Sequence, residues 1–278
     1  TGLSAVHRAL FAAGARRESG RSVVVVCADE AEAGRMAGDL RALTGEEVRT
    51  LFAREFTFHS AAVVSREWEH KRLSTLRAMA AGEAGIVVAS VEAMLQRTMP
   101  PALLAQASQV LRVGERYDLA ELAETLSAAG YTRCEQVEGV GQFALRGGIL
   151  DFFSPAQAKP VRAEFFGDEV DSMGLFDPAT QRRTGNINQA EILPAAEVLP
   201  QFAPGGCAGL LEGMDGLIAR AGRRGGDGTL LENLREDRER LAQGLGFPAL
   251  DRYLALIYPT LATAADYMSP DALVILSE

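Results

Sequence analysis

The chain carries the run Ser22-Val23-Val24-Val25-Val26-Cys27, and this stretch indicates the fold of the sequence around it. A continuous β-branched run bounded by turn residues is typical of a strand buried on both faces. Helical patterns flank it, an Ala-rich one over residues 5–18 and another over residues 31–43. Two further apolar runs, Ile86-Val87-Val88-Ala89-Ser90 and Ala272-Leu273-Val274-Ile275-Leu276, predict buried strands of the same kind. We therefore predict an α/β layer in which strands from both ends of the chain form one parallel sheet.

The middle of the chain has a different pattern, which begins at about Val113. A predicted helix over residues 119–129 precedes short strands in which apolar and polar residues alternate, as in an antiparallel sheet with one face in water. The clearest local signal is a hairpin, because Val161-Arg162-Ala163-Glu164-Phe165-Phe166 and Glu169-Val170-Asp171-Ser172-Met173 flank Gly167-Asp168. The glycine supplies the positive φ that a tight turn needs. The middle is therefore predicted to be a smaller α+β unit.

Beyond Pro194 and Pro200 the sequence becomes helical again before the last apolar run. The helical patterns cover residues 216–221, 230–245 and 249–256. We divide the chain into an α/β half over residues 1–112, an inserted α+β unit over residues 113–198, and a helical return over residues 199–278 that completes the first sheet.

The composition is that of an ordinary globular protein, with 278 residues and 47% hydrophobic content. At ~100–200 residues per domain, this length suggests two packed units. The net charge is −9 and the chain has no block of Lys and Arg, so binding of a DNA duplex by this chain alone is disfavoured. The sequence therefore favours a partner other than nucleic acid.

The cysteines and the apolar runs indicate a compartment. Cys27, Cys134 and Cys207 lie far apart and are not paired with histidines at metal-ligand spacing, so we expect inert thiols in a reducing cytosol and no metal site. No run reaches the ~18–20 apolar residues that cross a bilayer, and the chain is expected to be cytoplasmic. Both ends look cut out of a longer sequence, so the function is expected to be that of a part.

The first residues lie where a phosphate-binding loop would lie, just before a helix. Against the pattern G-x-x-x-x-G-K-[ST] only Gly2 matches, and His7, Arg8 and Ala9 take the places of the second glycine, the lysine and the hydroxyl residue. Those three groups allow close approach to phosphate, charge neutralisation and magnesium binding. An imidazole would crowd the phosphate and Ala9 offers magnesium no ligand, so we expect ATP hydrolysis to be lost even if some anion still binds.

The last residues, Leu273-Val274-Ile275-Leu276-Ser277-Glu278, have the shape of the second helicase box, a buried strand that delivers acidic residues to magnesium. Ser277 occupies the place of the usual aspartate, and Glu278 follows it. Taken alone, the two features are an ordinary helix start and an ordinary core strand. Together they indicate a degenerate P-loop, helicase-like fold in which both nucleotide boxes have eroded, without a cofactor of its own.

The sequence resembles the transcription-repair coupling factors in their amino-terminal region, which is similar to the excision-repair helicase UvrB. The resemblance covers essentially the whole chain. Its most specific stretches are Gly141-Gln142-Phe143-Ala144-Leu145-Arg146-Gly147-Gly148-Ile149-Leu150-Asp151-Phe152-Phe153, Pro160-Val161-Arg162-Ala163-Glu164-Phe165-Phe166-Gly167-Asp168-Glu169-Val170-Asp171-Ser172 and Phe176-Asp177-Pro178-Ala179-Thr180-Gln181-Arg182. Supporting matches are Ser65-Arg66-Glu67-Trp68-Glu69-His70 and Val88-Ala89-Ser90-Val91-Glu92-Ala93-Met94-Leu95-Gln96-Arg97.

Two departures favour the coupling factor over UvrB itself. The phosphate loop is eroded, and residues 52–68 are short where UvrB carries a long tyrosine-rich hairpin that clamps DNA. The resemblance implies that this chain brings UvrA to a stalled RNA polymerase. It also implies that the parent protein is an ATP-dependent DNA translocase, with polymerase binding, DNA binding, ATP and Mg²⁺ in domains absent from this chain.

The resemblance places the UvrA-binding element in the inserted unit, with Arg133, Arg146 and Phe153 at the interface. Period-two alternation agrees for Arg146, since it puts Phe143 and Leu145 on one strand face and Arg146 on the other. Arginine and aromatic residues are enriched at interface hot spots. The alternative interpretation is that the arginines are solvated strand residues paired with Glu135 or Asp151, and that Phe153 belongs to the core.

Other candidate residues have simpler interpretations. His7, His59 and His70 lack an acid or nucleophile at catalytic spacing. Residues 66–72 form a charge-rich helix turn that is expected to be a solvated face with local ion pairs. The aromatic residues nearby are expected to lie in the core rather than to stack on bases; these are Phe52, Phe56, Phe58 and Trp68.

Two rival functions remain open from sequence. An active UvrB-type helicase subunit would bind ATP and damaged DNA and would show a magnesium-dependent ATPase activity that depends on Arg8. A DNA-binding accessory domain would show salt-dependent affinity for a duplex, which the acidic balance of the chain opposes.

Overall fold

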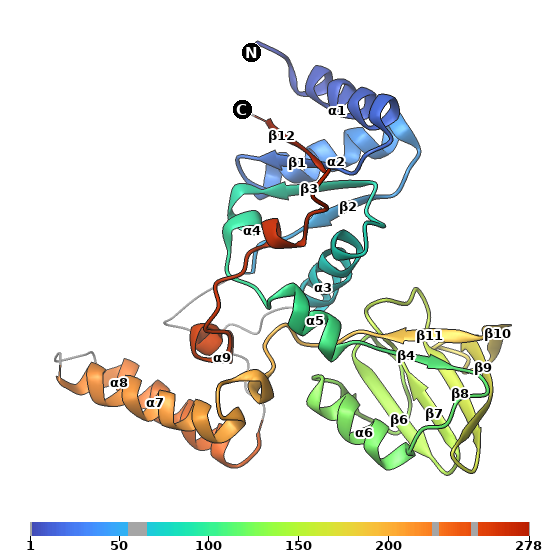
Figure 1. Cartoon of the computed structure of the whole chain (residues 1–278), viewed down its shortest axis with the longest axis vertical. Helices are drawn as coiled ribbons and strands as arrows, with labels where there is room; N and C mark the ends of the chain where they lie inside the picture. The colour runs from blue at the N-terminus through green and yellow to red at the C-terminus, as the bar shows by residue number, and fades with distance from the viewer. Residues whose placement is uncertain (1, 55–65, 224–227, 246–249, 278) are drawn as a thin grey trace.

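The computed structural model describes residues 2–54, 66–223, 228–245 and 250–277, and Figure 1 shows the chain. Its first part contains α1 (Ala5–Ser19), β1 (Val23–Cys27), α2 (Glu30–Thr44), β2 (Val48–Leu51), α3 (Arg66–Ala80), β3 (Ile86–Ser90), α4 (Val91–Leu95) and α5 (Pro101–Ala107). The middle contains β4 (Gln109–Arg112), α6 (Leu119–Ala128), β5 (Thr132–Arg133), β6 (Gln142–Arg146), β7 (Ile149–Phe152), β8 (Val161–Phe166), β9 (Glu169–Phe176), β10 (Arg183–Asn186) and β11 (Gln189–Ile192). The last part contains η1 (Pro200–Phe202), α7 (Gly206–Arg223), α8 (Gly228–Ala242), η2 (Leu250–Tyr253), α9 (Leu254–Ile257), η3 (Ala264–Tyr267) and β12 (Leu273–Ser277).

The described residues at the two ends of the chain form one parallel sheet in the order β12-β1-β3-β2, as predicted. β1 lies in its middle, with Cys27 opposite Ser277 on one side and Ser90 on the other. Alternate residues of β1 enter two different cores. Val23 and Val25 pack with α1 and α2, whereas Val24 and Val26 pack with α3 and the helical return. The continuous valine run therefore reflects helices on both faces of the sheet, with α1 and α2 at the top of Figure 1.

The last strand differs from its prediction as a fully buried strand. Among the described strands β12 lies at the edge and pairs with β1 alone, and its residues alternate in exposure. Leu273 and Ile275 pack against the α1 and α2 core, whereas Val274 is 48% exposed and Leu276 is 68% exposed. An edge strand with a helix layer over one face alone keeps half of its apolar side chains accessible, which the apolar run by itself does not reveal.

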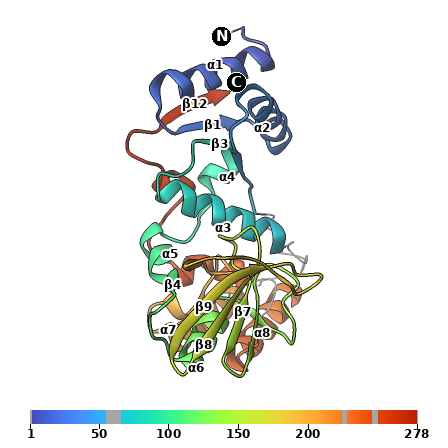
Figure 2. The ribbon, with the colours of Figure 1, turned by 90° about the vertical axis from the view of Figure 1, so that its right-hand side faces the viewer.

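The middle of the chain folds around a sheet in the order β10-β9-β8-β7-β6-β5, which we call the six-stranded sheet. The predicted hairpin is confirmed as β8 and β9, and Gly167 at its turn has φ +66°. One face, here called the inner face, carries Phe143, Leu150 and Ala163 against α6. The opposite or outer face carries Ala144, Asp151 and Arg162 in neighbouring strands. In Figure 2 strands β7, β8 and β9 lie in front of α6, so the outer face is turned to the viewer.

The helical return packs on the α/β half rather than on the six-stranded sheet. Leu210 and Met214 of α7, with Tyr253, Ile257 and other residues of the return, share one core with α3 and β3. α7 and α8 lie side by side at the lower left of Figure 1. No helix among the described residues is both long enough and apolar enough to cross a membrane.

Candidate functional site

The start of the chain forms the entrance of α1. Gly2 has φ +71°, Ser4 is the N-cap, and the Ser4 hydroxyl lies 2.8 Å from His7 Nδ1. His7 is exposed, whereas Ala9 is fully buried against the sheet. Ala9 therefore lies in the core between α1 and the sheet, and its methyl group offers no polar ligand there.

Arg8 leads to a polar cluster at the carboxyl ends of β1 and β12. Arg8 Nη1 donates to Glu32 Oε1 at 2.9 Å and to Ser277 Oγ at 2.7 Å, and the Ser277 hydroxyl donates to the same Glu32 oxygen at 2.9 Å. Ser277 lies beside Cys27, and burial followed by the charge of Glu32 raises the pKa of the Cys27 thiol to about 11. The side chains of Arg8, Glu32 and Ser277 therefore hydrogen-bond to one another at this strand end. Glu278, which was also expected at the nucleotide site, lies outside the described residues.

The outer face of the six-stranded sheet contains a second charged cluster, centred on Asp151. Asp151 is fully buried and accepts two hydrogen bonds from Arg162, at 2.7 and 2.8 Å, and one from Arg146 Nη2 at 2.8 Å. The Arg146 side chain is 52% exposed, compared with 21% for Arg162. Two arginines on one carboxylate leave the more exposed one with unused donors, since Nε and Nη1 of Arg146 make no hydrogen bond to the described residues.

Phe153 lies near the same face at the other end of β7. It is partly buried and packs with Val137, Ala144 and Phe176. The structure thus contains elements of both sequence interpretations, because Arg146 is paired with Asp151 and yet half exposed, and Phe153 contributes to a small core and yet keeps some exposure.

Arg133 lies on the opposite side of the sheet from Arg146. β5 pairs with β6 so that Arg133 is the partner of Phe143, whose side chain points to the inner face. Paired residues on neighbouring strands point to the same side. Arg133 is exposed at the edge of the sheet, and no hydrogen bond or ion pair to the described residues holds its guanidinium group. The two arginines therefore do not form one cluster.

The charge-rich turn of α3 is not the solvated face that its sequence predicts. Glu67 and Lys71 do form the expected exposed i,i+4 ion pair at 2.7 Å. However, Arg72 is 1% exposed and donates to the fully buried Glu197 at 3.1 Å, with Arg54 also near that carboxylate. Burial alone would raise the pKa of Glu197, but the two arginines hold it below its usual value. Because Glu197 lies 125 residues away in sequence, helix periodicity could not reveal this pair.

Glu69 and His70 of the same turn are also enclosed. The Glu197 backbone N–H donates to Glu69 Oε1 at 2.7 Å, and burial raises the pKa of Glu69 to about 7. His70 Nε2 lies 3.0 Å from the carbonyl oxygen of Ala195, and burial lowers the pKa of His70 to about 4. These residues join α3 to the end of the inserted unit and so have a structural role.

The aromatic residues beside α3 are more exposed than predicted. Trp68 is 46% exposed, with its ring 4.4 Å from the ring of Phe52 and the Lys71 ammonium 4.8 Å from its centre. The reason is that α3 turns its other side to the core, with Leu73 and Leu76 fully buried as their spacing predicts. The predictions for Phe56, Phe58 and His59 fall outside the described residues. Cys207 is exposed, in contrast to the buried Cys27.

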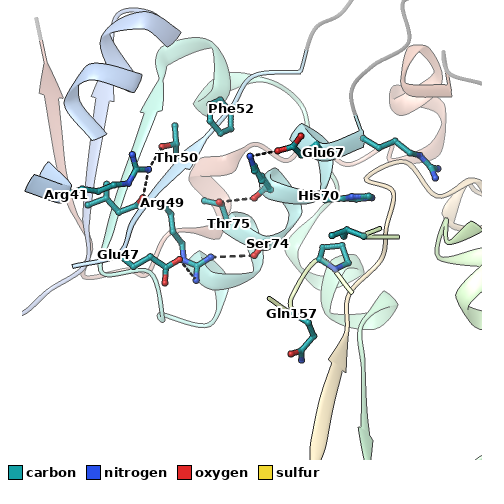
Figure 3. Close-up of a pocket in the computed structure, with 15 residues that line it drawn as sticks. Arg41, Glu47, Arg49, Thr50, Phe52, Glu67, His70, Ser74, Thr75 and Gln157 are labelled. Atoms are coloured by element: carbon teal, nitrogen blue, oxygen red, sulfur yellow. Dashed lines mark hydrogen bonds and ion pairs between the residues drawn. The ribbon is translucent and has the colours of Figure 1, made fainter. Parts of the chain in front are cut away.

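A cleft of about 740 Å³ lies between the α/β half and the inserted unit. Figure 3 shows Arg41, Arg49 and Thr50 on one side and Gln157 on the other. Its cations are already engaged, since Arg41 donates to the Val48 carbonyl at 2.8 Å and Arg49 pairs with Glu47 at 3.0 Å. Arg66 and Lys71 also line the cleft: Lys71 pairs with Glu67 at 2.7 Å, and Arg66 donates to the Thr132 hydroxyl at 3.3 Å and to the Gly130 carbonyl at 3.4 Å.

Comparison with known proteins first identifies the class of the middle unit. Residues 110–198 match the family model described as the UvrB interaction domain. This range contains the six-stranded sheet, α6, β11 and all of β4 except its first residue, Gln109. The fold and the match together define a mixed α/β protein that carries a UvrB interaction domain.

The relatives then identify the family. The chain is 32% identical over its full length to a transcription-repair-coupling factor of Bacillus subtilis, and 28% identical over 91% of its length to that of Haemophilus influenzae. Over 41% of its length it is 41% identical to the factor of Myxococcus xanthus. The chain belongs with the transcription-repair-coupling factors as their UvrB-like module. The chain spans 24% of the length of the Bacillus subtilis protein.

Proposed function

We propose that this chain is the UvrA-recruiting module of a transcription-coupled excision-repair factor, and that the outer face of the six-stranded sheet binds UvrA. The observation that carries the proposal is the position of Arg146, a half-exposed arginine within the range that matches a UvrB interaction domain. Arg133 and Phe153 lie within the same range.

Arg146 has the properties of an interface anchor. Its Nη2 is fixed by a buried carboxylate, while Nε and Nη1 remain available to an acceptor on a partner. A guanidinium held in place loses less conformational freedom on binding and can engage a partner carboxylate through its planar fork. Truncation of such an anchor costs about 2 kcal/mol, which is about 30-fold in affinity.

Arg133 requires a separate test, because it lies at the sheet edge on the inner side. If the partner wraps around the edge formed by β5 and β6, both arginines contact it. If the partner covers the outer face alone, Arg146 contributes and Arg133 does not. Single variants of the two residues therefore map the direction in which UvrA approaches.

We also propose that the α/β half is a P-loop helicase-like fold that has lost ATP turnover. Arg8, Glu32 and Ser277 hydrogen-bond to one another at the strand ends, and Ala9 is buried without a hydroxyl, so these residues do not suit the binding of a Mg²⁺-bound nucleotide. An active UvrB-type helicase is the alternative. Magnesium-dependent release of phosphate from ATP by the purified chain, abolished in Arg8→Ala, would establish that alternative. Equal rates of release by the wild-type chain and by Arg8→Ala would support the proposal.

The relatives are about four times longer than the part that this chain matches, since that part is 24% of the Bacillus subtilis protein. We propose that the parent protein is an ATP-dependent DNA translocase of the cytoplasm that displaces stalled RNA polymerase, with ATP, Mg²⁺, DNA and polymerase bound by its other domains. This chain would then recruit UvrA and would not itself translocate on DNA. In agreement, its net charge of −9 opposes phosphate binding.

The test is a calorimetric titration of UvrA into the chain and into three variants: Arg133→Ala, Arg146→Ala and the double variant. Circular dichroism checks that each variant is folded. We expect a micromolar or tighter complex that Arg146→Ala weakens about 30-fold. If the wild-type chain does not bind UvrA but binds duplex DNA with salt-dependent affinity, the result would favour an accessory DNA-binding domain.

A further inference from the structure

Phe166 is the most exposed large apolar side chain among the described residues, at 85%. It is the last residue of β8, directly before the turn at Gly167. Its neighbour Phe165 points inward and packs against the core of the inserted unit. Phe165 is therefore packed on the core while Phe166 is left in water, where its ring contributes no free energy of apolar burial to the isolated chain.

The turn that carries Phe166 lies beside the turn that follows Arg146. The Phe165 N–H donates to the Gly148 carbonyl oxygen at 2.8 Å, which joins the β8–β9 turn to the β6–β7 turn. A Cβ at Gly148 would lie 2.9 Å from the Phe165 carbonyl oxygen, so a side chain there would separate the two turns. Residues 146–149 and 165–167 therefore meet at one end of the sheet.

The register places Phe166 on the outer face together with Arg146. Arg146 pairs with Ile149, and Ile149 pairs with Glu164 on β8. Phe166 comes two residues after Glu164, and a strand returns to the same face every second residue. Ile149 is itself 36% exposed. Two apolar side chains and a half-exposed guanidinium thus share one end of the outer face.

The turn is held by backbone contacts from a third segment. The Tyr117 N–H donates to the Asp168 carbonyl oxygen at 2.8 Å, and the Val170 N–H donates to the Glu115 carbonyl oxygen at 3.0 Å. Between them, the backbones of Arg116 and Glu169 form an antiparallel β-bridge. Phe166 is therefore presented from a fixed backbone, which lowers the conformational entropy that a contact at this position costs.

We propose that Ile149 and Phe166 form the apolar half of the UvrA-docking surface whose charged half is Arg146. The proposal rests on the proposed function and specifies the chemistry of the partner segment, an apolar side chain beside a carboxylate. The carboxylate meets the unused donors of Arg146, and the apolar side chain covers Ile149 and Phe166 and excludes water from that ion pair. Such a shield of apolar contacts around a polar anchor is typical of interface hot spots.

The experiment is a calorimetric titration of UvrA into the wild-type chain, Phe166→Ser and Phe11→Ser. Phe11 is a matched control, since it is 61% exposed and lies on α1, away from the six-stranded sheet. We expect Phe166→Ser to raise the dissociation constant at least about tenfold and Phe11→Ser to change it less than about twofold. Phe166→Leu keeps an apolar side chain and is expected to stay within about threefold of wild type.

The outcomes separate this inference from the proposed function. Wild-type binding with Phe166→Ser unchanged would overturn the apolar surface and leave UvrA recruitment standing. Absence of wild-type binding would overturn both. Sedimentation velocity of the chain alone supplies the last arm, because a dimer that Phe166→Ser disperses would assign the surface to a second copy of this chain and overturn the proposal.

Discussion

Asp151 organises the charges of the outer face, because this one buried carboxylate holds both Arg146 and Arg162. The two arginines differ in how much they depend on the Asp151 carboxylate. Arg162 is mostly buried and lies over the ring of Phe176 at 4.8 Å, whereas half of the Arg146 side chain is in water. Arg162 therefore stabilises the fold, and Arg146 is the member that a partner can reach.

This difference predicts the stability of two variants. Asp151→Asn leaves Arg162 without its counter-charge and should lower the free energy of unfolding by about 3 kcal/mol. Arg146→Ala removes a largely exposed partner and should lower it by less than about 1 kcal/mol. Urea denaturation measures both values. Equal losses in the two variants would contradict the assignment of Arg146 as a surface residue.

The raised pKa of Glu69 predicts a dependence of stability on pH. Its folded pKa of about 7 exceeds the ordinary glutamate pKa of 4.5, so the folded state binds the proton more tightly and stability falls as pH rises between these values. Glu69→Gln keeps an oxygen to accept the Glu197 N–H and carries no charge. It should be more stable than wild type at pH 8, by about 3 kcal/mol at most, and similar to it at pH 4. Thermal unfolding at both pH values tests this, and a variant less stable than wild type at pH 8 would refute it.

At the scale of elements, local patterns predict what depends on local sequence. The valine run of β1, the helix of residues 119–129 and the β8–β9 hairpin are all confirmed, since each is determined by periodicity or by a turn glycine. The exposure of β12 was predicted wrongly because it depends on which strand lies at the sheet edge. The burial of Arg72 was missed because its partner, Glu197, comes from a distant segment.

The contact between α3 and the six-stranded sheet predicts a strict requirement for glycine at position 141. Gly141 has φ +78°, and a Cβ there would lie 2.9 Å from the ring of the buried His70. Gly141→Ala should therefore lower the free energy of unfolding by about 2 kcal/mol or more. Gly147→Ala is the matched control, since φ is +60° there and no atom of the described residues lies within 4 Å of the added Cβ. Equal losses in the two variants would show that backbone strain alone accounts for the effect.

At the scale of the molecule, buried charges connect the three parts of the chain. Arg54 and Arg72 of the α/β half meet Glu197 at the end of the inserted unit, and the Tyr258 hydroxyl of the helical return donates to the Glu197 carbonyl. In Figure 1, α3 lies between the parallel sheet of the α/β half and the other two parts. Phe153 lies beside Gly141, which packs on α3, whereas Arg146 lies at the other end of β7, at the β6–β7 turn, where a partner can bind without contacting this junction.

We propose that this chain binds UvrA through the outer face of the six-stranded sheet. The most direct measurement is the dissociation constant of the complex, obtained by titrating UvrA into the wild-type chain and into Arg146→Ala at equal salt. We predict a micromolar or tighter complex for wild type and an affinity about 30-fold lower for the variant, whose fold is retained. An undetectable wild-type complex, or equal affinities for the two chains, would contradict the claim.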